Sequence, residues 1–165
     1  MKGANYRVIR GQPYGRREYI KGNPALKIAK FHTGVKSNNY EIKLQLAVKF
    51  RAQIRHNAIE AARVSANKIL NQIGPDVYHL SVVAYPHIVL KENKMIATAG
   101  ADRLQEGMRR AFGKPTGLAA RAEIGTTILE VRIMKEHLSE AKRALKTASS
   151  KLPITCFIRE IELKN

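Results

Sequence analysis

The sequence predicts an α+β fold in which two helices pack on a mostly antiparallel β-sheet, an α/β sandwich. Three observations predict it: an alternating apolar segment at 40–50, two segments with helical apolar spacing at 55–75 and 136–153, and several short apolar segments separated by turn residues. Closely spaced strands with only two helices among them are typical of such a sandwich. The 165 residues, 44% of them hydrophobic, suffice for one domain with one core.

The first 36 residues are predicted to form a basic extended arm. Prolines and glycines divide this segment into short pieces, and Tyr6, Tyr14 and Tyr19 lie among its lysines and arginines. Residues 26–31, LKIAKF, have the composition of a short strand. A solvated, poorly ordered terminus is the alternative. The tyrosines favour an arm that becomes ordered on RNA.

Residues 40–50, YEIKLQLAVKF, predict a half-buried strand because apolar and polar residues alternate strictly. The apolar face would consist of Ile42, Leu44, Leu46, Val48 and Phe50.

Residues 55–75 predict the first long helix. Asn57 is the expected N-cap, and Gly74 with Pro75 would end the helix. The apolar face is predicted to consist of Ile59, Ala62, Ala66, Ile69 and Ile73.

The remaining segments predict further strands and the second helix. Residues 77–94 read as one or two strands interrupted at Pro86, and residues 118–134 as two more, broken at Gly125. Residues 154–163 predict the closing strand. The helix at 136–153 would bury a stripe made of Leu138, Ala141, Leu145, Ala148 and Leu152.

A long inter-strand loop is predicted at 95–118, and it holds a lysine between glycines. A phosphate-binding loop of the Walker type is excluded, because Gly107 and Gly113 are separated by five residues and Pro115 follows Lys114. A short capped helix over 103–112, ending at Gly113, is one remaining reading. The other is contact with a phosphate backbone through the arginines and lysines that flank the segment.

The formal net charge is +17, from 30 Lys and Arg against 13 Asp and Glu. The excess is concentrated in residues 1–59, with 13 basic and 2 acidic side chains, whereas residues 122–165 carry 8 and 6. A charge this large repels itself and predicts a polyanionic partner. Nucleic acid is the first candidate and an acidic membrane surface the second.

Enzyme, cofactor and metal chemistry have little support in the sequence. Cys156 is the single cysteine, with five scattered histidines, so neither a disulfide nor a zinc site is expected. Cys156, His79 and His87 are expected to be structural, and Glu60 with Arg63 a surface pair. No catalytic triad or acid pair has suitable spacing. The absence of a signal sequence or a long apolar run predicts a soluble intracellular protein without a membrane partner. Because no catalytic or nucleotide-binding motif fits, neither a small-molecule substrate nor a cofactor is expected.

Four segments together carry a resemblance to a known family: RREYIKGNPALKIAKF, RHNAIEAARVSANKIL, YPHIVLKENKM and AGADRLQEGMRRAFGKPTGLAARAEIG. They resemble the archaeal branch, L-ten-e, of the universal large-subunit ribosomal protein that is called L-sixteen in bacteria. The resemblance extends from about Tyr6 to the final strand. A general nucleic-acid-binding protein outside the ribosome is the alternative reading, and a nucleotide-dependent enzyme the third.

The resemblance implies a structural, non-enzymatic protein of the cytoplasmic large ribosomal subunit, near the peptidyl-transferase centre and the central protuberance. Its implied partners are large-subunit rRNA, tRNA at the peptidyl and aminoacyl sites, and neighbouring large-subunit proteins. The residues expected to contact rRNA are Arg7, Arg10, Arg16, Arg17, Lys21, Lys36, Arg51, Arg55, His56, Arg63, Lys91, Lys94 and Arg121. The loop residues expected near tRNA are Arg103, Gly107, Arg109, Arg110, Gly113 and Lys114.

Overall fold

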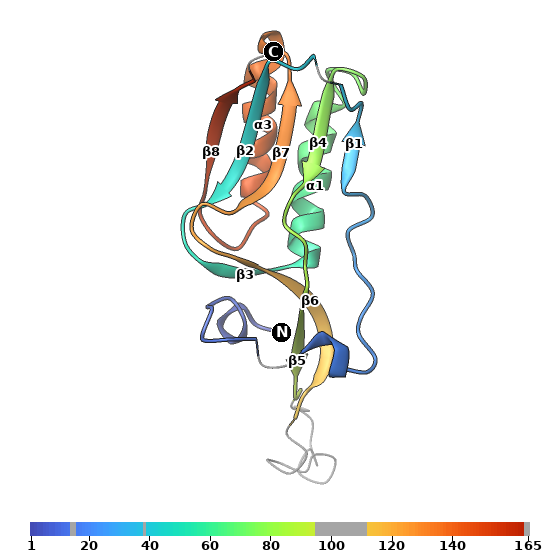
Figure 1. The fold of residues 1–165 in the computed structure, drawn as a ribbon, viewed down its shortest axis with the longest axis vertical. Helices are drawn as coiled ribbons and strands as arrows, with labels where there is room; N and C mark the ends of the chain where they lie inside the picture. Colours follow the sequence, from blue (N-terminus) through green and yellow to red (C-terminus); the bar gives the residue numbers. More distant parts are fainter. Residues whose placement is uncertain (14–15, 38, 95–111, 164–165) are drawn as a thin grey trace, which may run out of the picture.

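A computed structural model describes residues 1–13, 16–37, 39–94 and 112–163. Its larger sheet has five strands in the order β1-β4-β7-β2-β8, and every neighbouring pair among them is antiparallel (Figure 1). The strands are β1 (His32–Gly34), β2 (Ile42–Val48), β4 (Tyr78–Val82), β7 (Thr127–Ile133) and β8 (Cys156–Glu162).

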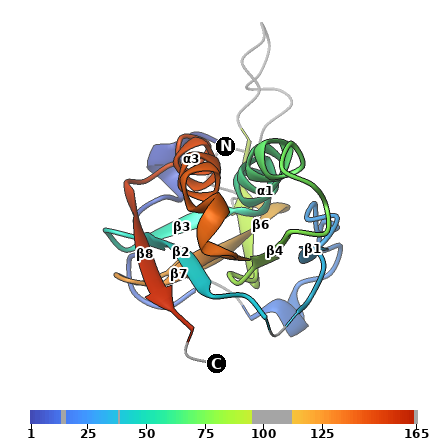
Figure 2. The same cartoon turned by 90° about the horizontal axis from the view of Figure 1, so that it is seen from above.

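Two helices cover one face of this sheet. Helices α1 (His56–Leu70) and α3 (Leu138–Ser149) lie side by side on that face (Figure 2). Alternate residues of β2, β4 and β7 pack against small side chains of the helices, such as Ala62, Ala66, Ala144 and Ala148, which allow close approach. This architecture confirms the predicted α+β fold class.

The strand periods were predicted correctly except at one end. In β2, the predicted apolar residues Ile42, Leu44, Leu46 and Val48 are buried. The strand ends at Val48, however, and Phe50 is 57% exposed, so the prediction that Phe50 belongs to the apolar face was wrong. The chain turns after Val48, whose carbonyl accepts a hydrogen bond from the Gly125 amide at 2.9 Å. That turn carries Phe50 out of the alternation.

The helix ends differ from the predicted ones by a few residues. Asn57 does not cap α1: the helix begins at His56, and the Asn57 carboxamide accepts a hydrogen bond only from the adjacent Ala58 amide. The helix ends at Leu70, and Gly74, with φ of +133°, follows a short turn. Of the stripe predicted for the second helix, Ala141, Leu145 and Ala148 are buried in α3, Leu138 is partly buried, and Leu152 is buried just after the helix ends.

A second, three-stranded sheet has the order β3-β6-β5. Its strands are β3 (Ala52–Arg55), β5 (Ile88–Glu92) and β6 (Lys114–Ala122). The predicted breaks at Pro86 and Gly125 are confirmed, because β4 and β5 lie on either side of Pro86 and β6 and β7 on either side of Gly125. The two strands at each break belong to different sheets, so β5 and β6 extend away from the helices (Figure 1).

The N-terminal segment packs beside the second sheet. It contains two short 3-10 turns, η1 (Gly3–Asn5) and η2 (Arg17–Tyr19), and it buries Ile9, Ile20 and Ile28. The short strand expected at 26–31 is not formed there. The strand is β1, which follows directly at His32–Gly34.

Candidate nucleic-acid interface

The hairpin of β5 and β6 fixes the base of the predicted loop. Its strands pair as far as Glu92 and Lys114. Gly113, with φ of +22°, lies so close to β5 that an added Cβ would be 3.0 Å from the backbone of Glu92. A glycine therefore suits this position, and it places the exposed Lys114 at the end of the hairpin. The predicted 103–112 helix, with Arg103, Gly107, Arg109 and Arg110, lies outside the described residues apart from Phe112.

A cation and an aromatic ring meet at this end of the hairpin. The Lys91 ammonium lies 3.9 Å from the centroid of the Phe112 ring, and the Phe112 side chain is 62% exposed. Exposed rings beside cations are typical of surfaces that bind RNA bases and phosphates. Lys91 was expected from the sequence, whereas Phe112 was not among the residues expected to contact RNA.

The N-terminal segment is joined to the second sheet through polar contacts. Gln53 of β3 makes two hydrogen bonds to this segment. Its backbone N–H donates to the Arg7 carbonyl at 2.8 Å, and its side-chain Nε2 donates to the Tyr6 carbonyl at 2.7 Å. Arg121 of β6 donates to the Gly11 carbonyl at 2.8 Å. These bonds hold the basic segment against the sheet that carries the hairpin.

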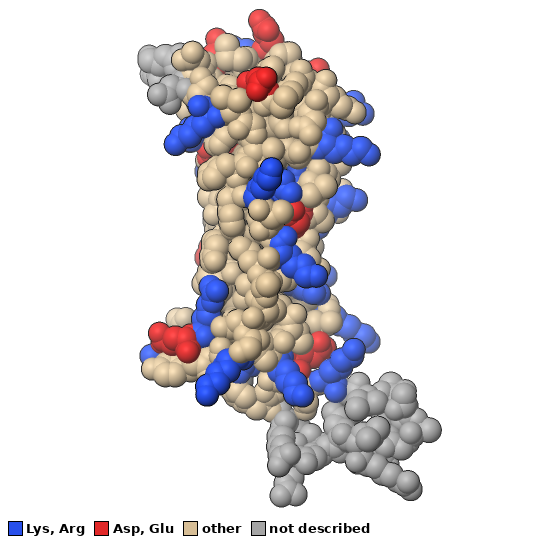
Figure 3. Space-filling model, turned by 90° about the vertical axis from the view of Figure 1, so that its right-hand side faces the viewer, with Lys and Arg blue, Asp and Glu red and all other residues tan. Residues whose placement is uncertain are grey.

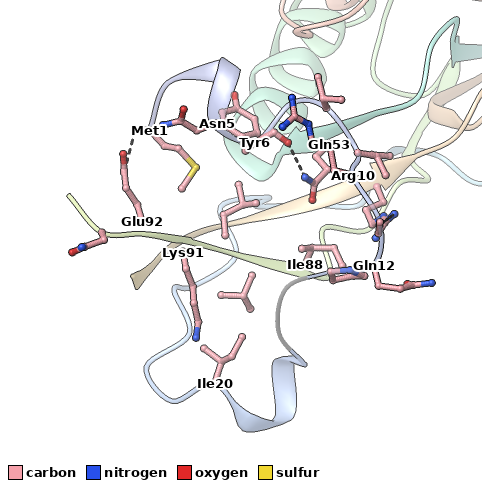
Figure 4. Close-up of a pocket in the computed structure, with 18 residues that line it drawn as sticks. Met1, Asn5, Tyr6, Arg10, Gln12, Ile20, Gln53, Ile88, Lys91 and Glu92 are labelled. Carbon is pink, nitrogen blue, oxygen red and sulfur yellow. Dashed lines mark hydrogen bonds and ion pairs between the residues drawn. The ribbon is translucent and has the colours of Figure 1, made fainter. Parts of the chain in front are cut away.

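A cavity of about 460 Å³ lies between this segment and β5. Its walls combine apolar side chains, such as Ile20 and Ile88, with the polar side chains of Arg10, Gln12 and Lys91 (Figure 4). The cavity thus lies among the expected RNA-contacting residues.

Most of the predicted cations reach solvent at or near this part of the molecule. Figure 3 shows Lys and Arg side chains spread over one face and gathered at the end that carries the second sheet. Arg16 lies 4.0 Å from Glu18, but both are exposed, so this pair contributes little. Arg55, Lys91 and Arg121 are partly buried. The exposed residues are Arg7, Arg10, Arg16, Arg17, Lys21, Lys36, Arg51, Lys94 and Lys114.

His56 has an internal role instead of a surface one. Its side chain is buried, with 3% exposed, and Nδ1 accepts a hydrogen bond from the Lys27 amide at 3.3 Å. Burial lowers the pKa of His56, and the charges of Arg55 and Lys27 lower it further. The structure therefore gives His56 the role of a buried, uncharged hydrogen-bond acceptor within the fold.

Arg63 also interacts with a partner inside the protein. It is 8% exposed, and its guanidinium donates two hydrogen bonds to the Glu60 carboxylate, at 2.6 and 2.9 Å. The expected pair exists, but it is partly buried, because Arg63 is buried and Glu60 is half-buried. Because Glu60 neutralises Arg63, this arginine adds no free positive charge to the interface.

Other reactive residue types have structural surroundings. Burial raises the pKa of the Cys156 thiol to about 11, so it is not a thiolate at neutral pH. His79 is buried in β4, and His87 lies exposed just before β5. Among the described residues, no group of histidine, cysteine and acidic side chains has the arrangement of a metal site.

Comparison with protein families gives one match over most of the chain: the family described as ribosomal protein L16p/L10e matches residues 9–159. The chain belongs to this family. A large ribosomal subunit protein uL16 from Staphylothermus marinus is 55% identical over 154 residues, covering 93% of this chain and 88% of the relative. The uL16 proteins of Hyperthermus butylicus and Metallosphaera sedula are 54% and 50% identical, over 96% and 98% of this chain and 88% and 94% of their own.

Membership of the L16p/L10e family makes the protein a structural constituent of the large ribosomal subunit in the cytoplasm, and not an enzyme. It also disfavours the alternative of a nucleic-acid-binding protein outside the ribosome. In the part of the chain that the structure describes, no helix is both long and apolar enough to span a membrane.

Proposed function

We propose that this L16p/L10e family member binds large-subunit rRNA, near the peptidyl-transferase centre and the central protuberance, through the basic end described above. The segment between β5 and β6 faces tRNA and helps to position it. The observation that carries the proposal is the β5–β6 hairpin, which extends beyond the helices with Lys91, Lys94 and Lys114 near its tip (Figure 1).

Charge and geometry support this division of roles. The exposed cations of the N-terminal segment lie on a framework tied to the second sheet by Gln53 and Arg121. A segment that is already folded contacts phosphates at a lower ordering cost than a disordered one, and such contacts position a protein on RNA without reading its sequence.

The test removes residues 102–111 and replaces them with a short glycine linker. Lys114 is kept, because it pairs with Glu92 at the start of β6. The sandwich contributes no residue to the deletion, so the variant should fold and enter large subunits. Those subunits should bind peptidyl-site tRNA roughly tenfold more weakly, which corresponds to about 1.4 kcal/mol.

Filter binding of peptidyl-site tRNA to purified subunits is the measurement, with the rate of peptide-bond formation as a second readout. The control is a second variant in which the segment keeps its natural length and Arg109 and Arg110 are retained, while the other residues from 102 to 111 are replaced by linker residues. Equal tRNA affinity and equal peptide-bond formation in deleted and normal subunits would show that the segment has no role in holding tRNA.

A further inference from the structure

The five-stranded sheet has a second face that the helices leave open. Both helices lie on the same side of the sheet, and no described element covers the other side (Figures 1 and 2). The strand register places the outward-pointing residues in two rows. One row is Gly34, His79, Arg132, Lys43 and Ile161, and the other is His32, Ser81, Glu130, Gln45 and Arg159. We call these two rows the outer face.

Positive charge on the outer face is not balanced within the protein. Lys43 lies directly opposite Arg132. Like charges facing each other across strands are destabilising, unless an anion lies between or above them. Glu130 is the acid within the two rows, and it accepts hydrogen bonds from Arg132 at 3.0 Å and Gln45 at 3.1 Å. No carboxylate of the described chain pairs with Lys43 or Arg159.

Rings lie at both edges of the outer face. His79 faces Gly34, which has no side chain, and the exposed His32 ring stacks over His79 instead, with centroids 5.4 Å apart and planes 7° apart. His79 is buried beneath it, and its Nδ1 has no hydrogen-bond partner. On the opposite edge, Phe157 is 39% exposed, with the Arg159 guanidinium 5.8 Å from its ring centroid.

From this arrangement we infer that the outer face is a second RNA-binding surface, separate from the basic end, which takes an unpaired stretch of RNA. Phosphates lie over Lys43 and Arg159, and unstacked bases stack on His32 and Phe157. The inference rests on the proposed function in that it assumes an RNA partner, but it assigns that partner to different residues and a different sheet.

RNA fits this surface better than a protein does. The cores of protein–protein interfaces are depleted of lysine and rich in apolar contact, whereas the outer face has cations at its centre. A flat sheet with exposed rings and adjacent cations can stack successive bases and neutralise the backbone between them. Double-stranded RNA offers no free base to the rings, so single-stranded RNA should bind more tightly.

The first variant combines Lys43→Glu with Arg159→Glu in the full-length protein. Glutamate at position 43 would face Arg132, so the sheet should be at least as stable as before. Lys68→Glu with Lys146→Glu, both exposed on the helices, is the matched control. The probe is single-stranded oligoadenylate, titrated by fluorescence anisotropy, with thermal unfolding measured on each variant. Because one lost phosphate contact costs roughly fivefold in affinity near 0.1 M salt, the outer-face variant should bind at least about tenfold more weakly than the control.

The second variant separates stacking from charge. His32→Ala should weaken binding of oligoadenylate, and His32→Phe should restore it, since phenylalanine keeps a ring without a titratable nitrogen. If His32→Ala binds oligoadenylate as tightly as the parent protein does, His32 does not stack on RNA bases.

The outcomes distinguish this inference from the proposed function. The triple variant Arg16→Ala, Arg17→Ala, Lys21→Ala reports on the basic end, with rRNA from large subunits as the probe. If that variant binds rRNA weakly while Lys43→Glu/Arg159→Glu binds both probes like its control, the outer-face inference is overturned and the proposed function stands. The reverse result would overturn the proposed function alone. Normal RNA binding combined with loss of the outer-face variant from subunits would identify a protein partner and also overturn the inference.

Discussion

Residues of the same type have different roles according to their burial. His32 is exposed and offers its ring to solvent, whereas His56 is buried and accepts a hydrogen bond from Lys27. Arg16 reaches solvent, whereas Arg63 is enclosed with Glu60. A charge that is paired and desolvated contributes to folding, and one that stays hydrated remains available to a phosphate.

Mild acid should destabilise the free protein because two histidines are held neutral. Burial lowers the pKa of His56, with help from Arg55 and Lys27. Burial also lowers the pKa of His79, with His32, Arg132 and Lys36 lowering it and Glu130 opposing them. The unfolded histidines bind protons near pH 6.5 while the folded ones do not, so stability is complete above that pH and is lost as pH falls toward the folded pKa values.

Urea unfolding at about pH 7 and pH 5 measures this effect. The doubly substituted protein His56→Gln/His79→Gln should lose less of its free energy of unfolding between the two pH values than the parent does. His87→Gln, at an exposed position, is the control and should lose as much as the parent. A parent protein equally stable at both pH values would contradict the prediction.

At the scale of the elements, short β1 depends on one glycine. Gly34 has φ of +86°, and an added Cβ would clash with the carbonyl oxygen of Tyr78. That carbonyl accepts a hydrogen bond from Val35 at 3.1 Å, so it cannot move without disrupting the edge of the sheet. The same glycine leaves the space opposite His79 that the His32 ring covers.

Gly34→Ala should therefore destabilise the protein by about 3 kcal/mol or more, from backbone strain and the clash together. Gly22→Ala is a matched control: Gly22 has φ of +70°, but nothing lies within 4 Å of an added Cβ. Its cost should be only that of the left-handed backbone, roughly 1–2 kcal/mol. Free energies of unfolding from urea titrations give both values. Equal losses for the two variants would show that the Tyr78 carbonyl adapts without cost.

At the scale of the whole molecule, the net charge is +17, and two surfaces carry cations that acidic neighbours do not balance. One is the basic end made by the N-terminal segment and the β3-β6-β5 sheet, and the other is the outer face of the large sheet. Neither has enough acidic residues to balance its cations. Repulsion within the free protein should make both surfaces favourable sites for a polyanion.

Binding to large-subunit rRNA should consequently weaken steeply with salt, since released counterions drive it. The slope of log affinity against log salt should be about −0.7 to −0.9 for each phosphate contact. The variant Arg16→Ala, Arg17→Ala, Lys21→Ala should have a shallower slope by about two to three contacts while its melting temperature stays close to that of the parent. Those three side chains are exposed and contribute nothing to the core. An affinity that is constant from low to high salt would refute a phosphate-dominated interface, and a large loss of stability would show that these residues support the fold.

The sequence by itself determined the elements of this protein and its family resemblance. Periodicity located β2, α1 and α3, turn residues located the breaks at Pro86 and Gly125, and four segments identified the relatives. Only the tertiary structure decided that strands on either side of each break join different sheets, that His56 and Arg63 are internal, and that Lys43, Arg132 and Arg159 share one face. The physical reason is that a local period reports whether one face of an element is buried, whereas neighbours across strands depend on pairing between residues far apart in the chain. The polar side of β2 was visible in the sequence, but its significance depends on β7 and β8 lying beside it.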